Sequence, residues 1–268
     1  MKRLKWSIKP FSKPNSCGLA LALALASHFY SLYFMHTLFI SDLHLDARQP
    51  AVLQLFHDFI NQQAAHAEKL YILGDFVEYW LGDDDPNPEF LDCFKALKKL
   101  SQNGTRVFLM HGNRDFLLGK QMLANYGIEL IDDPTLIDLY GTPTVLMHGD
   151  TLCSDDVKYQ AFRQQVRDAH WQTAFLAKPM AERIAMVKGL REASQAATGG
   201  KSSEIMDVNQ IEVEKVMRKY KVQQLIHGHT HRPKTHHFFL DKQPCTRIVL
   251  ADWQDHCCYL KINNDALS

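Results

Sequence analysis

The chain has 268 residues, of which 46% are hydrophobic and 22% charged, so it can form one large domain or one domain with a sizeable insertion. Its 30 Lys and Arg balance its 30 Asp and Glu, which argues against a protein that binds nucleic acid by neutralising many phosphates. The six cysteines form no C-x-x-C pair, which argues against a disulfide scaffold and a zinc ribbon. The 14 histidines, several of them beside Asp, Asn or Gly, favour a metal site instead.

Residues 1–34 have features of a secretory signal, with a basic start and an apolar run at Gly18–Ala26. The run is too short to span a bilayer comfortably. Met35 is followed directly by a strand-like segment, so residues 1–34 are also consistent with an extension upstream of the true start. Under both interpretations we expect the folded domain to comprise residues 35–268.

From Met35 onward, short apolar segments alternate with segments of helical periodicity. The strands are predicted at Thr37–Ile40, Lys69–Leu73, Arg106–Met110, Thr144–Met147, Gln224–Ile226 and Thr246–Leu250, and the helices at Gln49–Ala65, Pro88–Gln102 and Gly119–Tyr126. This alternation predicts an α/β fold.

Polar side chains that can bind metal follow five of these strands. The motifs, in chain order, are SDLHLD, GDFVE, GNRD, HGD and GHTHRP. Open α/β sheets place their functional sites at the carboxyl ends of strands, so we expect these motifs to meet. The candidate ligands are Asp42, His44, Asp75, Asn113, His148, His229 and His231.

The types and spacing of these residues favour a centre for two metal ions. Asp42 and His44 are two residues apart, so the spacing predicts that both side chains leave the end of one strand in the same direction. Imidazole and oxygen ligands without cysteine suit Mn²⁺, Fe²⁺ or Zn²⁺ better than Ca²⁺, and argue against a structural zinc site. With Asp75 as a bridging carboxylate, two such ions can clamp the attacking and leaving oxygens of a displacement at phosphorus.

The series D-x-H, G-D-x-x-E, G-N-x-D, H-G-D and G-H-x-H resembles the calcineurin-like metallophosphoesterases, from about Met35 to Trp253. The resemblance implies a four-layer fold, in which two central β-sheets are flanked by helices, and two Mn²⁺ ions per active site. It also implies how the ligands divide: Asp42, His44, Asp75 and His231 for one ion, and Asp75, Asn113, His148 and His229 for the other.

The chain departs from the commonest family pattern at Arg114. Many members have a histidine there that protonates the leaving group, whereas a guanidinium, which stays charged, cannot donate that proton. It can hold a phosphate oxygen with two hydrogen bonds. The substitution therefore predicts a leaving group that departs without protonation, such as one side of a pyrophosphate. We expect Arg114, Asp75 and His148 to be the catalytic residues.

The segments MHGDTLCSDD, REASQAATGGKS and GHTHRP resemble, more specifically, the branch of this family that acts in lipid A biosynthesis. This resemblance implies attack by water at the α-phosphorus of UDP-2,3-diacylglucosamine, which gives UMP and 2,3-diacylglucosamine 1-phosphate. It also implies a cytoplasmic protein, peripheral on the inner membrane. The implied substrate contacts are Asn113, Arg114, Asp156, Ser194, Thr198, Lys201 and His229.

An insertion is expected at about residues 152–220. Residues 156–201 carry eight Lys or Arg against four acidic residues, together with apolar residues at roughly helical spacing. One interpretation is a helical hairpin that packs on the core. The other, which we favour, is a helical lid whose apolar face lines an acyl-chain groove and whose cations meet phosphates or the cytoplasmic membrane surface.

Other functions remain open at this point. One alternative is a phosphoesterase of the same fold that acts on a soluble nucleotide or a phosphoprotein. A second is an interaction module without catalysis, although such a module has no reason to keep every ligand. A nuclease would need a continuous basic track, so we expect no nucleic-acid partner, and no motif indicates an obligate protein partner.

Overall fold

The computed structural model describes residues 36–84, 87–198 and 207–264, apart from the side chains of residue 89 and of residues 193–198. The predicted extension at residues 1–34 lies outside the described residues, as does Lys201. The side chains of Ser194 and Thr198 lie outside them too.

The first sheet has the strand order β10-β1-β2-β3-β4. Strands β1 to β4 are parallel, and β10 pairs antiparallel with β1 at one edge. All the motif-bearing loops of this sheet therefore leave it at the same edge. The bounds are β1 His36–Ile40, β2 Lys69–Leu73, β3 Arg106–Met110, β4 Ile128–Ile131 and β10 Leu260–Asn263.

The second sheet has the strand order β5-β6-β7-β9-β8. Its three central strands are parallel, and its two edge strands are antiparallel to their neighbours. The bounds are β5 Thr135–Leu139, β6 Thr142–Met147, β7 Gln224–His227, β8 Lys234–Leu240 and β9 Gln243–Val249.

Successive side chains of a strand point to opposite faces of its sheet, so each strand contributes to two different apolar layers. In β1, Leu38 and Ile40 pack into a cluster with helices α2, α3 and α4, whereas Phe39 packs between the two sheets. In β6, Leu146 faces the first sheet, and its neighbours face a third cluster that contains residues of α8. Apolar residues on both faces of a strand are what burial on two sides requires. The helix bounds are α2 Pro50–Gln62, α3 Pro88–Gln102, α4 Lys120–Asn125 and α8 Gln210–Tyr220.

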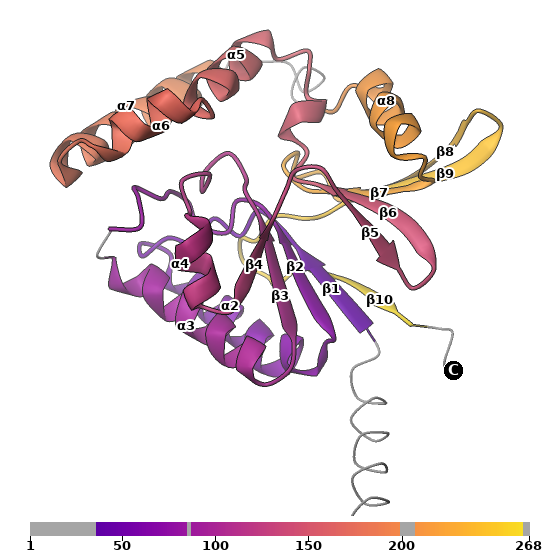
Figure 1. The fold of residues 1–268 in the computed structure, drawn as a ribbon, viewed down its shortest axis with the longest axis horizontal. Coiled ribbons are helices and arrows are strands. Elements are labelled where there is room, and N and C mark those ends of the chain that lie inside the picture. The colour runs from indigo at the N-terminus through magenta and orange to yellow at the C-terminus, as the bar shows by residue number, and fades with distance from the viewer. Residues whose placement is uncertain (1–35, 85–86, 199–206, 265–268) are drawn as a thin grey trace, which may run out of the picture. The chain divides into compact units, whose positions relative to one another are not determined.

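The structure confirms the predicted fold class of two sheets flanked by helices (Figure 1). Each predicted strand and helix is present, and α3 has the predicted bounds. Strands β4, β5, β8 and β10 were not predicted. All four lie at sheet edges, where exposed positions interrupt the apolar runs on which the prediction depended.

Three helices over the carboxyl ends of the strands form what we call the lid helices (Figure 1). They are α5 Val157–Val166, α6 Ala169–Leu176 and α7 Met180–Thr198. Helix α8 also falls within the predicted insertion, but its Val213 and Met217 are buried in the cluster behind the second sheet. The part of the insertion that covers the strand ends is therefore shorter than residues 152–220.

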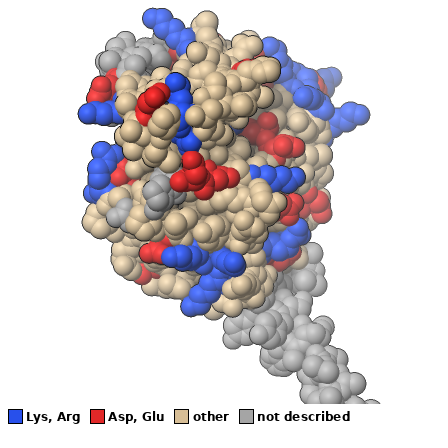
Figure 2. Space-filling model, turned by 60° about the vertical axis from the view of Figure 1, so that its left-hand side comes forward, with Lys and Arg blue, Asp and Glu red and all other residues tan. Residues whose placement is uncertain are grey.

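Two surface properties bear on function. Among the described residues, no helix is both long and apolar enough to cross a membrane. On the face seen in Figure 2, basic and acidic side chains are interspersed among uncharged ones, in keeping with the zero net charge.

Candidate metal centre and its pocket

Five of the seven candidate ligands have a left-handed backbone. The φ angles are 55° for Asp42, 47° for His44, 52° for Asp75, 66° for His229 and 53° for His231. Residues other than glycine adopt this conformation at a cost of about 1 kcal/mol or more each, and they are found there most often at functional sites. Asp and His are among the residue types that tolerate it best.

This backbone corrects the reason given for the D-x-H spacing. Strand β1 ends at Ile40, so Asp42 and His44 do not stand on an extended strand. Instead, the loops after β1 and β2 pair with each other, because the amides of Asp42 and His44 donate to the carbonyl oxygens of Gly74 and Asp75, both at 3.0 Å. The ligands of two separate loops are thereby held in register.

Two glycines allow the ligand loops to approach closely. A Cβ atom at Gly112 would lie 2.1 Å from Asp75 Oδ1, and one at Gly228 would lie 2.3 Å from Asp42 Oδ2. Any larger residue at either position would displace a candidate ligand. The backbone amide of His229 then donates to Asp42 Oδ2 at 2.8 Å, which joins the fifth motif to the first.

The first group of candidate ligands is Asp42, His44 and His231. Nε2 of His44 lies 3.4 Å from Nε2 of His231, which in turn lies 3.4 Å from Asp42 Oδ1. Two ligands about 2.1 Å from one ion at a tetrahedral angle are about 3.4 Å apart, so the spacing suits a shared ion.

The second group surrounds Asn113. Its Oδ1 lies 3.0 Å from His148 Nε2 and 2.9 Å from His229 Nδ1. Asp75 lies between the groups, with Oδ2 at 3.8 Å from His44 Nε2 and Oδ1 at 3.9 Å from His148 Nε2. The structure thus brings together all seven candidate ligands, with Asp75 in the position that a bridging carboxylate needs.

The donor atoms fit a pair of metal ions. Asp42 Oδ1 is buried and has no hydrogen-bond partner among the described residues. Nδ1 of His148 donates to the Leu73 carbonyl oxygen at 2.9 Å, and Nδ1 of His44 lies 2.9 Å from Glu78 Oε2. A partner on Nδ1 leaves Nε2 as the ligand atom, the arrangement that orients metal-binding histidines.

The electrostatics of the cluster also suit cations. Burial raises the pKa of Asp42. The imidazoles of His231, His148 and His44 lower this pKa by more than burial raises it, so it lies well below the usual range. Burial lowers the pKa of His229 to about 4, and His148 contributes to the same shift. Burial also lowers the pKa of His148, but Asp75, Asp150 and Asp42 outweigh it and raise this pKa to about 9, so the cluster favours positive charge and a metal ion must displace that proton. An ionised carboxylate and a neutral imidazole are the forms that bind metal.

Two aspartates beside the ligands hold the surrounding loops. Asp115 accepts hydrogen bonds from the backbone amides of Phe76 and Gly112, both at 2.7 Å, so it joins two of the ligand loops. Asp150 instead accepts from Tyr159 Oη and Arg163 Nε on α5, both at 2.7 Å. It therefore joins the metal centre to the lid helices.

Arg114 lies at the mouth of the centre. Its backbone amide donates to Asp75 Oδ1 at 2.8 Å, which fixes the start of the side chain beside the candidate bridging carboxylate. Its Nε is buried and has no hydrogen-bond partner among the described residues. This donor is available to an anion that enters the pocket.

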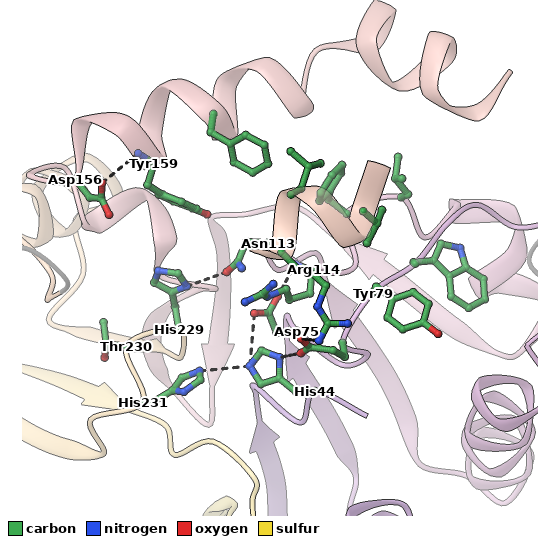
Figure 3. Close-up of a pocket in the computed structure, with 18 of the residues that line it drawn as sticks. His44, Asp75, Tyr79, Asn113, Arg114, Asp156, Tyr159, His229, Thr230 and His231 are labelled. Atoms are coloured by element: carbon green, nitrogen blue, oxygen red, sulfur yellow. Dashed lines mark hydrogen bonds and ion pairs between the residues drawn. The ribbon is translucent and has the colours of Figure 1, made fainter. Parts of the chain in front are cut away.

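A pocket of about 540 Å³ opens onto the metal centre. Figure 3 shows His44, Asp75, Asn113, Arg114, His229 and His231 around it. One side of the pocket is apolar, and we call it the apolar chamber. Its walls are Tyr79, Trp80, Phe116, Leu117, Phe162, Trp171, Phe175, Val187 and Leu190, which come from both the core and the lid helices.

Arginines of the lid helices reach down to the site loops. Arg167 donates to the Gly112 carbonyl oxygen at 2.7 Å, and Arg191 donates to Glu78 Oε1 at 2.7 Å. Arg183 donates to Asp84 Oδ1 at 2.6 Å and Oδ2 at 3.0 Å. Arg163, the fourth of these arginines, pairs with Asp150, and Lys178 pairs with Glu182. Five of the eight cations of the insertion thus have partners within the protein, so contact with phosphates or lipid headgroups stays a prediction for the others.

The predicted substrate contacts separate into two sets. Asn113, Arg114, Asp156 and His229 line the pocket, and Asp156 also accepts from the Tyr159 amide at 3.1 Å. Ser194, Thr198 and Lys201 fall on residues or side chains outside the described ones.

Sequence reasoning assigned no role to Glu78 or Asp252, and it placed Tyr159, Arg163 and Arg191 only among the apolar and basic residues of the insertion. Glu78 and Asp252 contact candidate ligands, the latter through Oδ2 at 3.4 Å from His231 Nδ1. Glu78 is the last residue of the motif GDFVE. Its position three residues after Asp75 could therefore have marked it as a residue of the site. The others depend on contacts between distant segments, which no local pattern indicates.

Comparison with known proteins agrees with this geometry. Residues 35–233 match the family described as Calcineurin-like phosphoesterase, which covers more than half of the chain. The chain belongs to this family and is therefore a hydrolase of the phosphoesterase class.

Among its relatives are proteins named UDP-2,3-diacylglucosamine hydrolase. The one from Cellvibrio japonicus is 51% identical over 219 residues, which cover 82% of this chain and 91% of the relative. The one from Marinobacter nauticus is 46% identical, over 86% of this chain and 95% of the relative. The one from Escherichia coli O7:K1 is 46% identical, over 86% and 96%.

Proposed function

We propose that the protein hydrolyses the pyrophosphate bond of UDP-2,3-diacylglucosamine and releases UMP and 2,3-diacylglucosamine 1-phosphate. The observation that carries the proposal is a single pocket that joins the candidate metal centre to the apolar chamber. A diphosphate with a nucleoside at one end and an acylated sugar at the other needs both. The relatives named for this substrate support the same assignment.

The apolar chamber is the proposed site for the acyl chains. Trp171 and Phe175 of the lid helices stack at 5.2 Å between ring centroids, and Phe116 of the core lies 6.4 Å from Trp171. Roughly 25 cal/mol is gained for each Å² of apolar surface removed from water, so the acyl chains supply binding energy at a distance from the reacting phosphates.

The proposed cofactor is a pair of Mn²⁺ ions held by the seven candidate ligands. The chemistry that such ions supply when bound is activation of water and stabilisation of charge on the attacking and leaving oxygens. Asp75 and His148 hold this arrangement from within the protein, since both side chains are almost fully buried and anchored to neighbouring loops.

Arg114 is the proposed catalytic group that the protein itself provides. Arg114 lines the pocket beside Asp75 and keeps a buried Nε donor without a partner among the described residues, so it is placed to stabilise a phosphate oxygen that gains charge as the bond breaks. Its guanidinium cannot supply a proton, so the leaving phosphate departs as an anion, which a pyrophosphate cleavage permits. Asn113 and His229 contact the other side of the same phosphate group in this proposal.

Peripheral binding to the cytoplasmic face of the inner membrane is also proposed. Five large apolar side chains among the described residues of the lid helices are exposed, and two of them, Phe162 and Leu190, line the pocket. The other three are Val157 at 72%, Ile184 at 52% and Leu176 at 37%. Because the four lid arginines are engaged, these apolar residues are the proposed contacts with the bilayer. The remaining expectations, a domain that begins near residue 35 and substrate contacts from Ser194, Thr198 and Lys201, stay part of the proposal.

The test is UMP release by the full chain with added Mn²⁺. It compares UDP-2,3-diacylglucosamine with its deacylated analogue. We expect rapid release from the acylated substrate, little from the analogue, and loss of both on chelation. Equal turnover of the two substrates would contradict the lipid assignment and favour a soluble nucleotide as substrate. Activity that survives chelation would contradict the metal centre.

A further inference from the structure

The pocket has a second, polar end that the proposed function leaves unexplained. It is lined by Asp156, Lys158, Thr230 and Arg232, and we call it the polar end. Figure 3 shows Thr230 and Asp156 on the far side of His229 from Tyr79, which lines the apolar chamber. The metal centre therefore lies between an apolar and a polar part of one continuous pocket.

The chemistry of the proposed substrate gives this arrangement a direction, and the inference rests on that proposed function. In a nucleotide-linked sugar, the nucleoside and the sugar are attached to opposite ends of the diphosphate. With the diphosphate at the metal centre and the acyl chains in the apolar chamber, the nucleoside extends toward the polar end.

Two side chains of the polar end, Thr230 and Arg232, have hydrogen-bonding capacity that the described residues do not use. Thr230 Oγ1 is buried and has no hydrogen-bond partner among the described residues, which is unfavourable unless a ligand satisfies it. Arg232 is 38% exposed and donates from Nη1 to Asp207 Oδ2 at 3.2 Å. That ion pair steadies a planar guanidinium whose remaining donors and flat faces suit the carbonyl oxygens and ring of a pyrimidine.

The backbone explains why these two side chains reach the pocket. His229 and His231 both have left-handed φ angles, and the Thr230 amide between them donates to the Gly228 carbonyl oxygen at 2.8 Å. In this tight turn, four consecutive residues from His229 to Arg232 line the pocket. The two histidines face the metal centre, and the polar end is built directly from the residues that alternate with them.

We propose that the polar end is a nucleoside subsite, in which Thr230 and Arg232 bind the uridine of the substrate and of the product UMP. Both are positioned by the same loop that carries two candidate ligands, so the nucleoside and its phosphate are recognised by one short segment. Discrimination against a substrate that lacks the nucleoside follows from the loss of these hydrogen bonds.

The test uses the full chain loaded with Mn²⁺. Three ligands are titrated into it separately in a calorimeter: UMP, inorganic phosphate and 2,3-diacylglucosamine 1-phosphate. The variants are Thr230→Val, which keeps the shape and removes the hydroxyl, and Arg232→Gln. The matched control is Arg218→Gln, because Arg218 forms a similar ion pair with Asp241, at 3.0 Å, away from the pocket.

The wild-type protein is expected to bind UMP more tightly than inorganic phosphate. Each pocket variant is expected to weaken UMP binding by at least about ten-fold, as loss of a hydrogen bond from a buried or charged group does, with phosphate and the acylated sugar phosphate unchanged. The Arg218→Gln control should retain wild-type affinity for UMP.

Three results would overturn the subsite: UMP and phosphate of equal affinity in the wild type, wild-type UMP affinity in both variants, or equal weakening of all three ligands. These results are distinct from failure of the proposed function. If the wild type releases no UMP from UDP-2,3-diacylglucosamine and does not bind the acylated sugar phosphate, the function itself is wrong.

Discussion

The metal centre and the lid helices are held in place in different ways. The candidate ligands lie on short loops whose own backbones pair, and several have left-handed φ angles that local hydrogen bonds support. The lid helices are joined to the same loops by side chains of four arginines, across up to 113 residues of sequence. The candidate ligands are thus positioned by the backbone, whereas the lid helices are positioned by side-chain contacts that can change separately.

The largest expected effect comes from the centre of the ligand cluster. Asp75→Ala should lower kcat at saturating Mn²⁺ by more than about 10³-fold, well above the 10- to 100-fold that loss of an outer partner of a ligand produces. Measured metal content should fall as well. Asp138→Ala removes an exposed carboxylate on β5 and is the control. Retention of most activity in Asp75→Ala would contradict the bridging role.

Arg114→Ala tests the group that lies between the two regions. We expect kcat to fall about 100-fold, as loss of one donor to a developing negative charge does. Metal content should stay the same, because Arg114 is not among the candidate ligands. Arg114→Lys should recover only part of the rate, since an ammonium lacks the planar pair of donors. Steady-state kinetics with wild-type rates in Arg114→Ala would remove Arg114 from the mechanism.

Glu78 is where the two regions meet, because it contacts both His44 and Arg191. Glu78→Gln should weaken Mn²⁺ binding by about ten-fold, since it removes the carboxylate that orients a ligand imidazole. Titration of the metal-free protein with Mn²⁺ measures this. Arg191→Met, which loosens the lid side of the same contact, should change Mn²⁺ affinity less. Equal effects of both variants would show that the two regions act as one unit.

The smallest expected effect concerns the attachment of the lid helices at Arg183. Arg183 is 5% exposed and also donates to the carbonyl oxygens of Leu81 and Leu176. Arg183→Met leaves these acceptors without that donor and should lower the free energy of unfolding by about 1–3 kcal/mol. Urea denaturation measures it, with the exposed Arg218→Met expected to cost less than about 1 kcal/mol. Loss of bound metal in Arg183→Met would contradict the separation of the two regions.

The sequence was sufficient to predict the central strands and which residues come together as candidate metal ligands. Continuous apolar runs mark strands buried on both faces, and the polar residues directly after them mark one edge of each sheet. Asp42, Asp75 and His148 could therefore be placed together without coordinates. The prediction that Asp42 and His44 leave the end of an extended strand was wrong. Both residues lie in a left-handed turn after β1, and pairing with the loop after β2 sets this turn.

The role of the lid arginines could not be predicted. Composition showed that the insertion is basic, but the partner of each cation is decided by tertiary packing. Arg183 meets Asp84 across 99 residues, and Arg167 meets a backbone carbonyl group, which has no signature in the sequence. The edge strands β5 and β8 were missed for a related reason, since alternating exposure hides them among polar segments.

The left-handed backbone of the ligands also determines how the protein tolerates mutation. At Asp42 and Asp75 the residue is constrained twice, by its carboxylate and by its φ angle. Branched residues such as Val or Ile are strained there, so they lower the amount of folded protein in a cell, whereas Asn and Gly accept the conformation. In a saturation-mutagenesis survey, cellular abundance at these positions should follow tolerance of the left-handed conformation, while activity is lost with nearly every substitution.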